Sequence, residues 1–369
     1  MSGSRANVGI RTIGFDECFT SLSPEATVDV LDRAAVMSRW GRAAPASGDS
    51  HGAAAFPAAQ FSAMSGDSLM FGHMGLVPGL GMCVKTGMQV PDNRNRGLDT
   101  VQASVLLFDA DTGVPQALLD GRAITIMRTA GALVAGIRKA LEVDDAMAGD
   151  ARRRKVAVIG YGAQGRHVAR LARAVLKADQ VDAFNRSACA AEPGVQMTNS
   201  VAEAVADADV IACATSSSEP VVDLAQLLSS RTTLSEANPA VVIGSLNSYE
   251  PTLTEIDPAI IAASTSVHID VPDPQKFGPI AQAGSGSDGR HSERQGNRPR
   301  ISLIGDPPDC ESTEPECGQR SLRTVLIGGH GLQDALLAFA VLHGWPAADA
   351  ATRRYTDTTG EWAQRQEDR

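Results

Sequence analysis

Residues 156–175 read VAVIGYGAQGRHVARLARAV, and this stretch decides the fold. Residues 156–159 are an apolar run typical of a buried strand, residues 160–165 supply three glycines, and residues 167–176 have helical spacing. In such a turn the first glycine permits the bend, the second lets the backbone approach a pyrophosphate, and the third lets helix and strand pack closely. The start of the helix also offers N–H groups to phosphates.

This turn predicts a dinucleotide site, and the alternative is a tight packing turn that binds nothing. The cofactor-binding candidates in it are Gly160, Gly162, Ala163, Gln164 and Gly165. Beyond it, strand and helix signals alternate in the runs QVDAFN, AEAVADA, DVIACATS and PAVVIGSL. This alternation is typical of a parallel sheet with crossover helices, so we expect a Rossmann-type α/β domain.

The end of the second expected strand bears on cofactor choice. An NAD site usually has a carboxylate there for the ribose 2′-hydroxyl, but this strand ends in Asn185 and Arg186, and Asp182 comes too early. A neutral residue followed by arginine suits a 2′-phosphate, which favours NADP and leaves NAD possible. The alternative for Arg186 is an exposed surface charge.

The run DVIAC is expected to be the fourth strand, and small residues follow it. Such residues let a cofactor lie across the sheet edge, and the alternative is an ordinary loop. The candidates at this position are Ala214, Thr215 and Ser216.

Composition limits the other function classes. The chain has 369 residues, which is length enough for two domains at roughly 150 residues each. Its net charge of -10 argues against nucleic acid and anionic lipid as partners. No segment resembles a signal peptide or a membrane span, so we expect a cytoplasmic protein. Cys310 and Cys317 lie in a polar stretch and could form a bridge or bind a metal, although cytosolic thiols are usually reduced.

The first part of the chain has a different pattern. A helix is expected over residues 20–40, with Ser23 before its first turn. Strand-like runs cover residues 68–77, 79–90 and 102–119, and the last contains a hairpin turn at residues 109–113. A long helix is expected from about Thr125. Near the end, residues 324–345 predict a strand, a glycine-rich turn and a closing helix, while residues 283–300 predict a surface loop.

The segments GLGMCVKTGMQVPDNRNRGLDT and LLFDADTGVPQALLDGRAITIMRTAGALVAGI resemble the ornithine cyclodeaminase/mu-crystallin family. The resemblance runs over residues 68–345. It implies an NAD(P)-dependent protein in which a Rossmann domain, residues 134–328, is inserted in an α+β substrate-binding and dimerisation domain, residues 1–133 and 329–369. The runs at residues 68–77 and 79–90 are too apolar to face water on an exposed sheet, so we expect a homodimer whose interface these strands form.

The resemblance assigns Lys85 and Arg128 as catalytic residues. Lys85 matches a family lysine near the substrate carboxylate and reacting carbon, and Arg128 matches an arginine used on the substrate carboxylate or cofactor phosphate. Arg128 and Thr129 are therefore cofactor-binding candidates too. Arginine binds carboxylates bidentately, and a lysine in a cleft can exchange protons. The alternative for both charges is a surface salt bridge.

Two departures from the family pattern matter. The segment HGAAAFPAAQFSAM lacks a family arginine, so one arm of the carboxylate clamp is absent or comes from elsewhere, with Arg42 as one source. The alignment also puts Asn247 at a family glycine and Tyr249 at the aspartate of cyclodeaminases.

The preferred function is an imine reductase or amino-acid dehydrogenase that acts on a small amino-acid or imine substrate, with Lys85 or a water supplying the proton. The alternatives are an ornithine or lysine cyclodeaminase that releases ammonia, and a non-catalytic NADPH-binding protein of the mu-crystallin kind.

Overall fold

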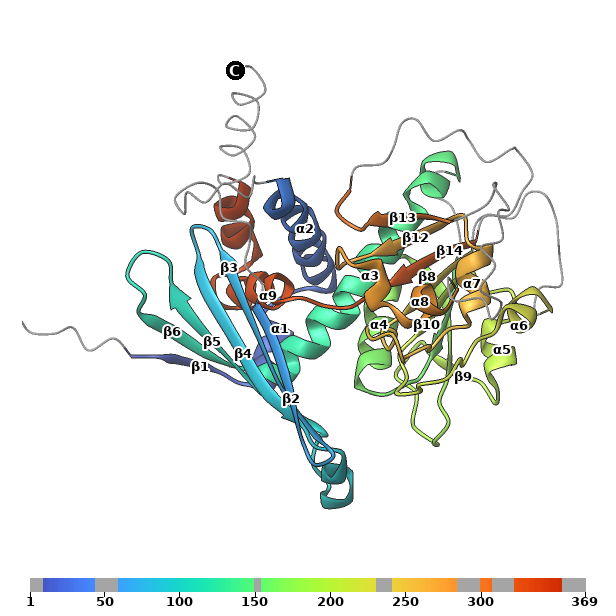
Figure 1. Cartoon of the computed structure of the whole chain (residues 1–369), viewed down its shortest axis with the longest axis horizontal. Helices are drawn as coiled ribbons and strands as arrows, with labels where there is room; N and C mark the ends of the chain where they lie inside the picture. The colour runs from blue at the N-terminus through green and yellow to red at the C-terminus, as the bar shows by residue number, and fades with distance from the viewer. Residues whose placement is uncertain are drawn as a thin grey trace, which may run out of the picture. The chain divides into compact units, whose positions relative to one another are not determined.

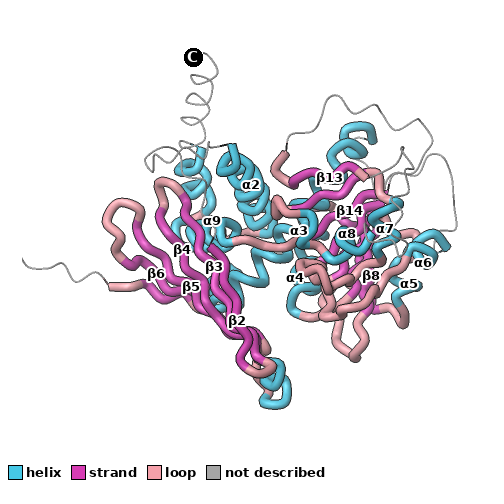
Figure 2. The backbone as a smooth tube through the Cα atoms, viewed as in Figure 1, coloured by secondary structure: helices cyan, strands magenta, loops and turns pink. Residues whose placement is uncertain are grey.

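The computed structural model describes residues 9–43, 59–148, 154–229, 241–283, 299–306 and 322–353. Two compact units are present: Met1–Arg128 with His330–Arg369, and Thr129–Gly329. The chain passes between them twice, within one long helix and again just before the closing helix. Figures 1 and 2 show a sheet in each unit: in the first unit all pairs are antiparallel except β1–β6, and in the second the sheet is parallel. The predicted fold class is confirmed.

The first unit is built on a six-stranded sheet of order β1-β6-β5-β4-β3-β2. Its strands are β1 (Arg11–Ile13), β2 (Ala59–Ser65), β3 (Ser68–Val77), β4 (Gly81–Gln89), β5 (Val101–Asp109) and β6 (Pro115–Asp120). Its helices are α1 (Phe15–Thr20), α2 (Pro24–Ala43), the 3₁₀ helix η1 (Pro91–Arg96) and α9 (Gly331–His343). Helix α9 packs on β3 and β4, and α2 packs on α9 (Figure 1). The sheet therefore has one face covered by helices of its own unit.

Most local predictions for this unit are confirmed. The Ser23 hydroxyl accepts a hydrogen bond from the N–H of Ala26 at the start of α2. In the β5–β6 hairpin, the Asp109 carboxylate accepts from the hydroxyl and N–H of Thr112, and Gly113 has φ +68°. Strand β2 was not predicted, because its small side chains carry little strand signal.

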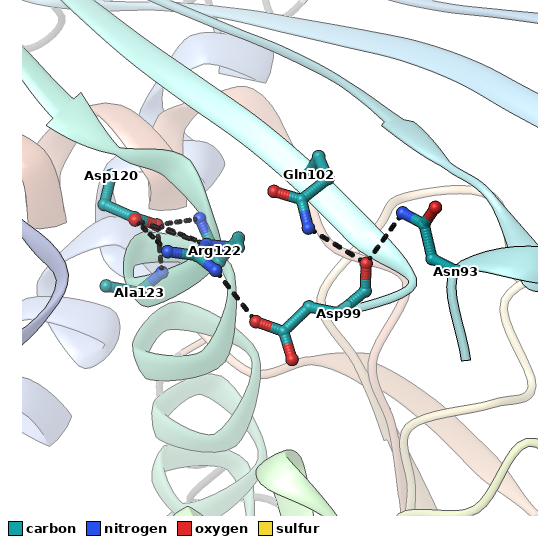
Figure 3. A network of polar contacts seen from close by, with 6 residues as sticks. All are labelled: Asn93, Asp99, Gln102, Asp120, Arg122 and Ala123. Atoms are coloured by element: carbon teal, nitrogen blue, oxygen red, sulfur yellow. Dashed lines mark hydrogen bonds and ion pairs between the residues drawn. The ribbon is translucent and has the colours of Figure 1, made fainter. Parts of the chain in front are cut away.

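The long helix α3 (Gly121–Ala148) begins earlier than the predicted Thr125. The Asp120 carboxylate accepts hydrogen bonds from the N–H groups of Arg122 and Ala123, at 2.8 and 3.2 Å, and so caps the helix. Arg122 binds Asp120 and Asp99 at 2.6 and 2.8 Å (Figure 3). Figure 3 also shows the Asp99 carbonyl accepting from the amide of Asn93 in η1. The start of α3 is thus fixed by polar contacts that hydrophobic spacing does not reveal.

The second unit is built on an eight-stranded sheet of order β13-β12-β14-β11-β10-β7-β8-β9, in which every pair is parallel. Its strands are β7 (Arg154–Ile159), β8 (Ala178–Phe184), β9 (Gln196–Met197), β10 (Val210–Cys213), β11 (Val241–Ser245), β12 (Ser266–Ile269), β13 (Arg300–Leu303) and β14 (Leu322–Leu326). Its helices beyond α3 are α4 (Ala163–Val175), α5 (Val201–Val205), α6 (Leu224–Ser229), α7 (Pro258–Ala263), η2 (Pro274–Lys276) and α8 (Gly278–Ala283).

The strand order reverses direction between β7 and β10, which are hydrogen-bonded neighbours. The run DVIAC does form the fourth strand of this sheet, β10. Open α/β sheets bind ligands at the carboxyl ends of strands at such a reversal. Helix α4 begins at Ala163, four residues before the predicted 167, because its first turn, residues 163–166, holds a glycine and two polar residues and so lacks an apolar helical pattern.

In the described part of the chain, no helix is long and apolar enough to cross a membrane. The same part contains no group of three or more His, Cys, Asp or Glu residues that could hold a metal. Cys310, Cys317 and nearly all of residues 283–300 lie outside the described residues.

Candidate functional site

A buried carboxylate, Asp334 of α9, gathers polar groups in the first unit. Its oxygens lie 2.7 Å from Lys85 Nζ, 2.8 Å from His73 Nδ1 and 3.5 Å from Arg128 Nε. Lys85 and Asp334 are each 1% exposed or less. The surface salt bridge considered for Lys85 is therefore wrong, since the ammonium lies inside the protein.

The strand register and two glycines build this cluster. His73 of β3 lies directly opposite Lys85 of β4, so both side chains emerge on the face that α9 covers. A Cβ at Gly331 would lie 2.1 Å from the Met74 carbonyl oxygen, and a Cβ at Gly75 would lie 2.2 Å from the Gly331 carbonyl oxygen. These glycines let the start of α9 touch β3, which brings Asp334 within reach of Lys85.

Charges within the cluster set its protonation. Burial alone would raise the pKa of Asp334, but Lys85 and Arg128 outweigh it and hold the pKa well below its usual range. Burial lowers the pKa of Lys85 to about 8, and attraction to Asp334 limits the decrease. Burial also lowers the pKa of His73, so its imidazole is neutral near pH 7. Because an ionised Asp334 only accepts, His73 Nδ1 carries the hydrogen, and Nε2 accepts from the Gln60 amide at 3.0 Å.

Arg128 and Thr129 of α3 carry buried polar atoms, Arg128 Nε and Thr129 Oγ1, that make no hydrogen bond within the described residues, although Arg128 Nε forms the ion pair with Asp334. Buried donors in native proteins are normally satisfied. Arg128 is 11% exposed, so its guanidinium retains limited access.

In the second unit, the protein's own packing requires two of the three glycines in the 160–165 turn. Gly160 has φ +92°, and a Cβ there would lie 2.6 Å from the Ala214 carbonyl oxygen. A Cβ at Gly165 would lie 1.9 Å from the Gly160 carbonyl oxygen. Gly162 differs, because its φ is -82° and a Cβ there would meet nothing within 4 Å. The space beside Gly162, at the start of α4, is therefore open, which suits a phosphate cradle at a helix N-terminus.

The end of β8 is tied to this turn through Asn185, whose side-chain oxygen accepts from the Tyr161 N–H at 2.9 Å. Arg186 next to it is exposed. Asp182 lies within β8, buried, with Lys155 Nζ at 2.8 Å. Asp182 is therefore engaged inside the unit, as its early position suggested, and the exposed charge at the end of β8 is Arg186.

A second buried carboxylate, Glu255, organises the loops after β10 and β11. It accepts hydrogen bonds from the N–H and hydroxyl of Thr215, from the Ser245 hydroxyl, and from the backbone of residues 246 and 247. Burial raises the pKa of Glu255, and these hydrogen bonds oppose the rise. The loop of Ala214, Thr215 and Ser216 is thus a fixed structure.

Three residues concern the two differences from the family pattern: Asn247, Tyr249 and Arg42. Asn247 and Tyr249 follow β11, and the Asn247 amide donates to the Ser217 carbonyl at 2.7 Å. Arg42 lies in the last turn of α2.

Sequence reasoning missed three of the residues described above: His73, Glu255 and Asp334. Asp334 carried the clearest signal, since it is an acidic residue in the otherwise apolar closing helix GLQDALLAFAVLH. Buried acids are rare unless they are paired.

Together, a Rossmann unit with a glycine turn and a unit with a buried lysine–aspartate pair define a class of dinucleotide-binding α/β protein. The sequence profile of the ornithine cyclodeaminase/mu-crystallin family matches residues 64–288. The chain belongs to this family.

Among its relatives is a Δ1-pyrroline-2-carboxylate reductase of Bacillus cereus, 34% identical over 143 residues. The match covers 36% of this chain and 42% of the relative, so the chain spans less than half the length of that relative.

Solved structures share the fold over nearly the whole chain. One is Δ1-pyrroline-2-carboxylate reductase of Thermococcus litoralis in complex with NADH and L-proline, with TM-score 0.68, 19% identity, and coverage of 91% of this chain and 98% of that one. Another is the iminosuccinate reductase of Paracoccus denitrificans in complex with NAD+, with TM-score 0.65, 21% identity, and coverage of 93% and 98%.

The glycine geometry gives a matched pair of substitutions. We expect Gly165→Ala to lower the free energy of unfolding by about 1–3 kcal/mol, because its Cβ meets a carbonyl oxygen. Gly162→Ala should leave stability unchanged but raise the Kd for NADPH or NADH roughly tenfold, about 1.4 kcal/mol, because its methyl group enters the phosphate cradle. Thermal unfolding and fluorescence titration measure both. Unchanged cofactor affinity in Gly162→Ala would show that the turn only packs.

Proposed function

We propose that the protein is an NAD(P)H-dependent oxidoreductase acting on C=N or C–N bonds of an amino-acid-derived substrate, with imine reduction as the preferred direction. The observation that carries this proposal is the buried Lys85, whose pKa is lowered to about 8 beside Arg128 and Asp334. A proton donor is most effective when its pKa lies near the working pH.

In this proposal each group has one task. Arg128 pairs with the substrate carboxylate through its guanidinium. Asp334 holds Lys85 by the hydrogen bond from Nζ, and Lys85 gives a proton from Nζ to the imine nitrogen. When bound, a reduced nicotinamide would supply the hydride that the C=N carbon requires. With that hydride and the proton from Lys85 the imine would become an amine, and the cofactor would be left oxidised.

The relatives favour a carboxylate-bearing cyclic imine of the Δ1-pyrroline-2-carboxylate kind as substrate. The alternative is a cyclodeaminase acting on ornithine or lysine. The alignment with Tyr249 at the cyclodeaminase aspartate argues against it, because a phenol is no carboxylate base.

Cofactor consumption tests the proposal. Purified protein is mixed with NADPH or NADH and a panel of cyclic and linear imines, and absorbance of the reduced cofactor is followed. We expect stoichiometric oxidation with at least one carboxylated imine. Ammonia release from ornithine without net cofactor change would instead identify a cyclodeaminase, and cofactor binding without either reaction would identify a binding protein.

Lys85 and Asp334 should affect turnover in distinct ways. We expect Lys85→Ala to abolish imine reduction while the Kd for NADPH stays nearly unchanged. In the wild type, kcat/KM should fall as the pH rises through about 8, because Nζ loses its proton. Asp334→Asn removes the charge that raises the pKa of Lys85, so this decline should move to lower pH. Full activity in Lys85→Ala would contradict the assignment of Lys85.

For the cofactor, we propose NADP with NAD as the weaker ligand, because exposed Arg186 can pair with a 2′-phosphate. A charge-assisted hydrogen bond of this kind contributes roughly 1.5–3 kcal/mol, or about ten- to a hundredfold in affinity. We expect NADPH to bind more tightly than NADH, and Arg186→Ala to remove most of the difference in a fluorescence titration. Equal affinities in the wild type would contradict the preference.

We also propose that the protein is a homodimer formed through the face of the first sheet opposite Lys85. Strand register puts four large apolar side chains on this face, and each is at least 39% exposed: Phe61, Met70, Met88 and Leu118. Extended apolar patches on a sheet mark interaction sites.

Light scattering tests the dimer. We expect a particle of twice the 38.5 kDa chain mass at micromolar concentration, and loss of half that mass in Met88→Glu or Leu118→Glu. The control is Leu228→Glu, an equally apolar exposed site in the second unit. A wild-type monomer at that concentration would contradict the dimer.

A further inference from the structure

Glu255 is a buried carboxylate of the parallel-sheet unit that accepts five hydrogen bonds, and it is not itself one of the candidate catalytic or cofactor-binding residues. It is 0% exposed. The donors that converge on it are the backbone N–H groups of residues 215, 246 and 247 and the hydroxyls of Thr215 and Ser245. All of them are donors, so they match an ionised carboxylate, which only accepts.

These donors come from two different strand ends. Thr215 follows β10, and residues 245–247 end and follow β11, so one carboxylate joins the loops of neighbouring strands. Oε1 takes both bonds from Thr215, and Oε2 takes the bonds from the β11 side, with Ser245 Oγ at 2.7 Å and the Asn247 N–H at 2.9 Å. The Asn247 amide then reaches back to the Ser217 carbonyl at 2.7 Å, which closes the connection between the two loops.

The position of these loops in the sheet indicates which half of a dinucleotide they would contact. In a doubly wound sheet, each half binds one mononucleotide on its side of the strand reversal. The glycine turn after β7 and the residues Asn185 and Arg186 after β8 belong to the half that takes the adenosine part. The loops after β10 and β11 belong to the other half.

We propose that Glu255 is a positioning residue for the nicotinamide half of the cofactor. It holds the loops after β10 and β11 in place and has no part in binding the adenosine half. This inference rests on the proposed function, because it needs a nicotinamide dinucleotide as the ligand. A glutamine cannot replace Glu255, since its amide would put two further donors against the N–H groups that converge there.

The test separates the two halves of the cofactor. For wild type and Glu255→Gln, the Kd is measured for NADPH and NADH and for the fragments 2′,5′-ADP and ADP, together with the KM for the imine and the midpoint of thermal unfolding. We expect the Kd of the whole cofactors to rise roughly tenfold, about 1.4 kcal/mol, while fragment affinities change less than about twofold. Equal losses for cofactors and fragments, or no loss for either, would overturn the inference.

Two further variants serve as a control and as a second, milder test. Asp257→Ala is the matched control, because Asp257 lies two residues along the same segment. Its carboxylate accepts from the N–H groups of Ala259 at 2.9 Å and Leu224 at 3.3 Å, at the starts of α7 and α6, and it takes none of the donors that converge on Glu255. This variant should lower stability and leave the ratio of cofactor to fragment Kd unchanged. Ser245→Ala removes a single donor to Glu255 and should raise that ratio by about two- to fivefold. If Glu255→Gln does not fold, an unchanged ratio in Ser245→Ala overturns the inference.

The outcomes also distinguish this inference from the proposed function. A wild type that binds NADPH and 2′,5′-ADP but reduces no imine contradicts the proposed reaction and leaves the role of Glu255 standing. A wild type that binds neither the cofactors nor the fragments overturns both.

Discussion

The charge of Asp334 is the constraint on which the first unit depends. Removing a carboxylate from water is costly, and it is tolerated only with nearby positive charge and hydrogen-bond donors. Lys85, Arg128 and His73 supply these from three elements, β4, α3 and β3. Each of these three partners is itself buried or nearly so. If Asp334 were removed, each would be left with a charge or a hydrogen-bond donor that nothing in the cluster satisfies. The pairing therefore specifies how α9, α3 and the sheet are arranged.

The two buried carboxylates, Asp334 and Glu255, have different surroundings, and these suit them to different chemical roles. Asp334 faces cations, which hold its pKa below the usual range, and it stays charged beside a lysine that can exchange a proton near pH 8. Glu255 faces only neutral donors, and burial raises its pKa. Groups whose surroundings move their pKa values in opposite directions have different tasks. Asp334 suits the control of a proton donor, and Glu255 suits the holding of loops.

Features that depend on residues close together in the sequence could be predicted, and features that depend on residues far apart could not. The glycine turn, the β5–β6 hairpin, the strand bearing Lys85 and the alternation after residue 175 are local patterns, and the structure contains each of them. The cap of α3 was missed because the apolar spacing starts after Asp120 makes its contacts. His73, Glu255 and Asp334 were missed because their partners are distant: 249 positions separate Lys85 from Asp334. No periodicity in one sequence indicates such a pair.

The glycines show why local and distant information must be combined. In the turn after β7, the sequence motif gives the three glycines different roles, and the contacts separate them in the same way: Gly160 and Gly165 are required by backbone atoms of the unit itself, and Gly162 by none. Gly75 carried no recognisable motif, and Gly331 was read only as part of a turn, yet together they permit the contact that places Asp334. Gly14 also has nothing within 4 Å of a Cβ, so open space alone indicates no ligand, and what sets Gly162 apart is its position between β7 and α4. The steric requirement at Gly75 and Gly331, in contrast, shows where the buried lysine–aspartate pair is assembled.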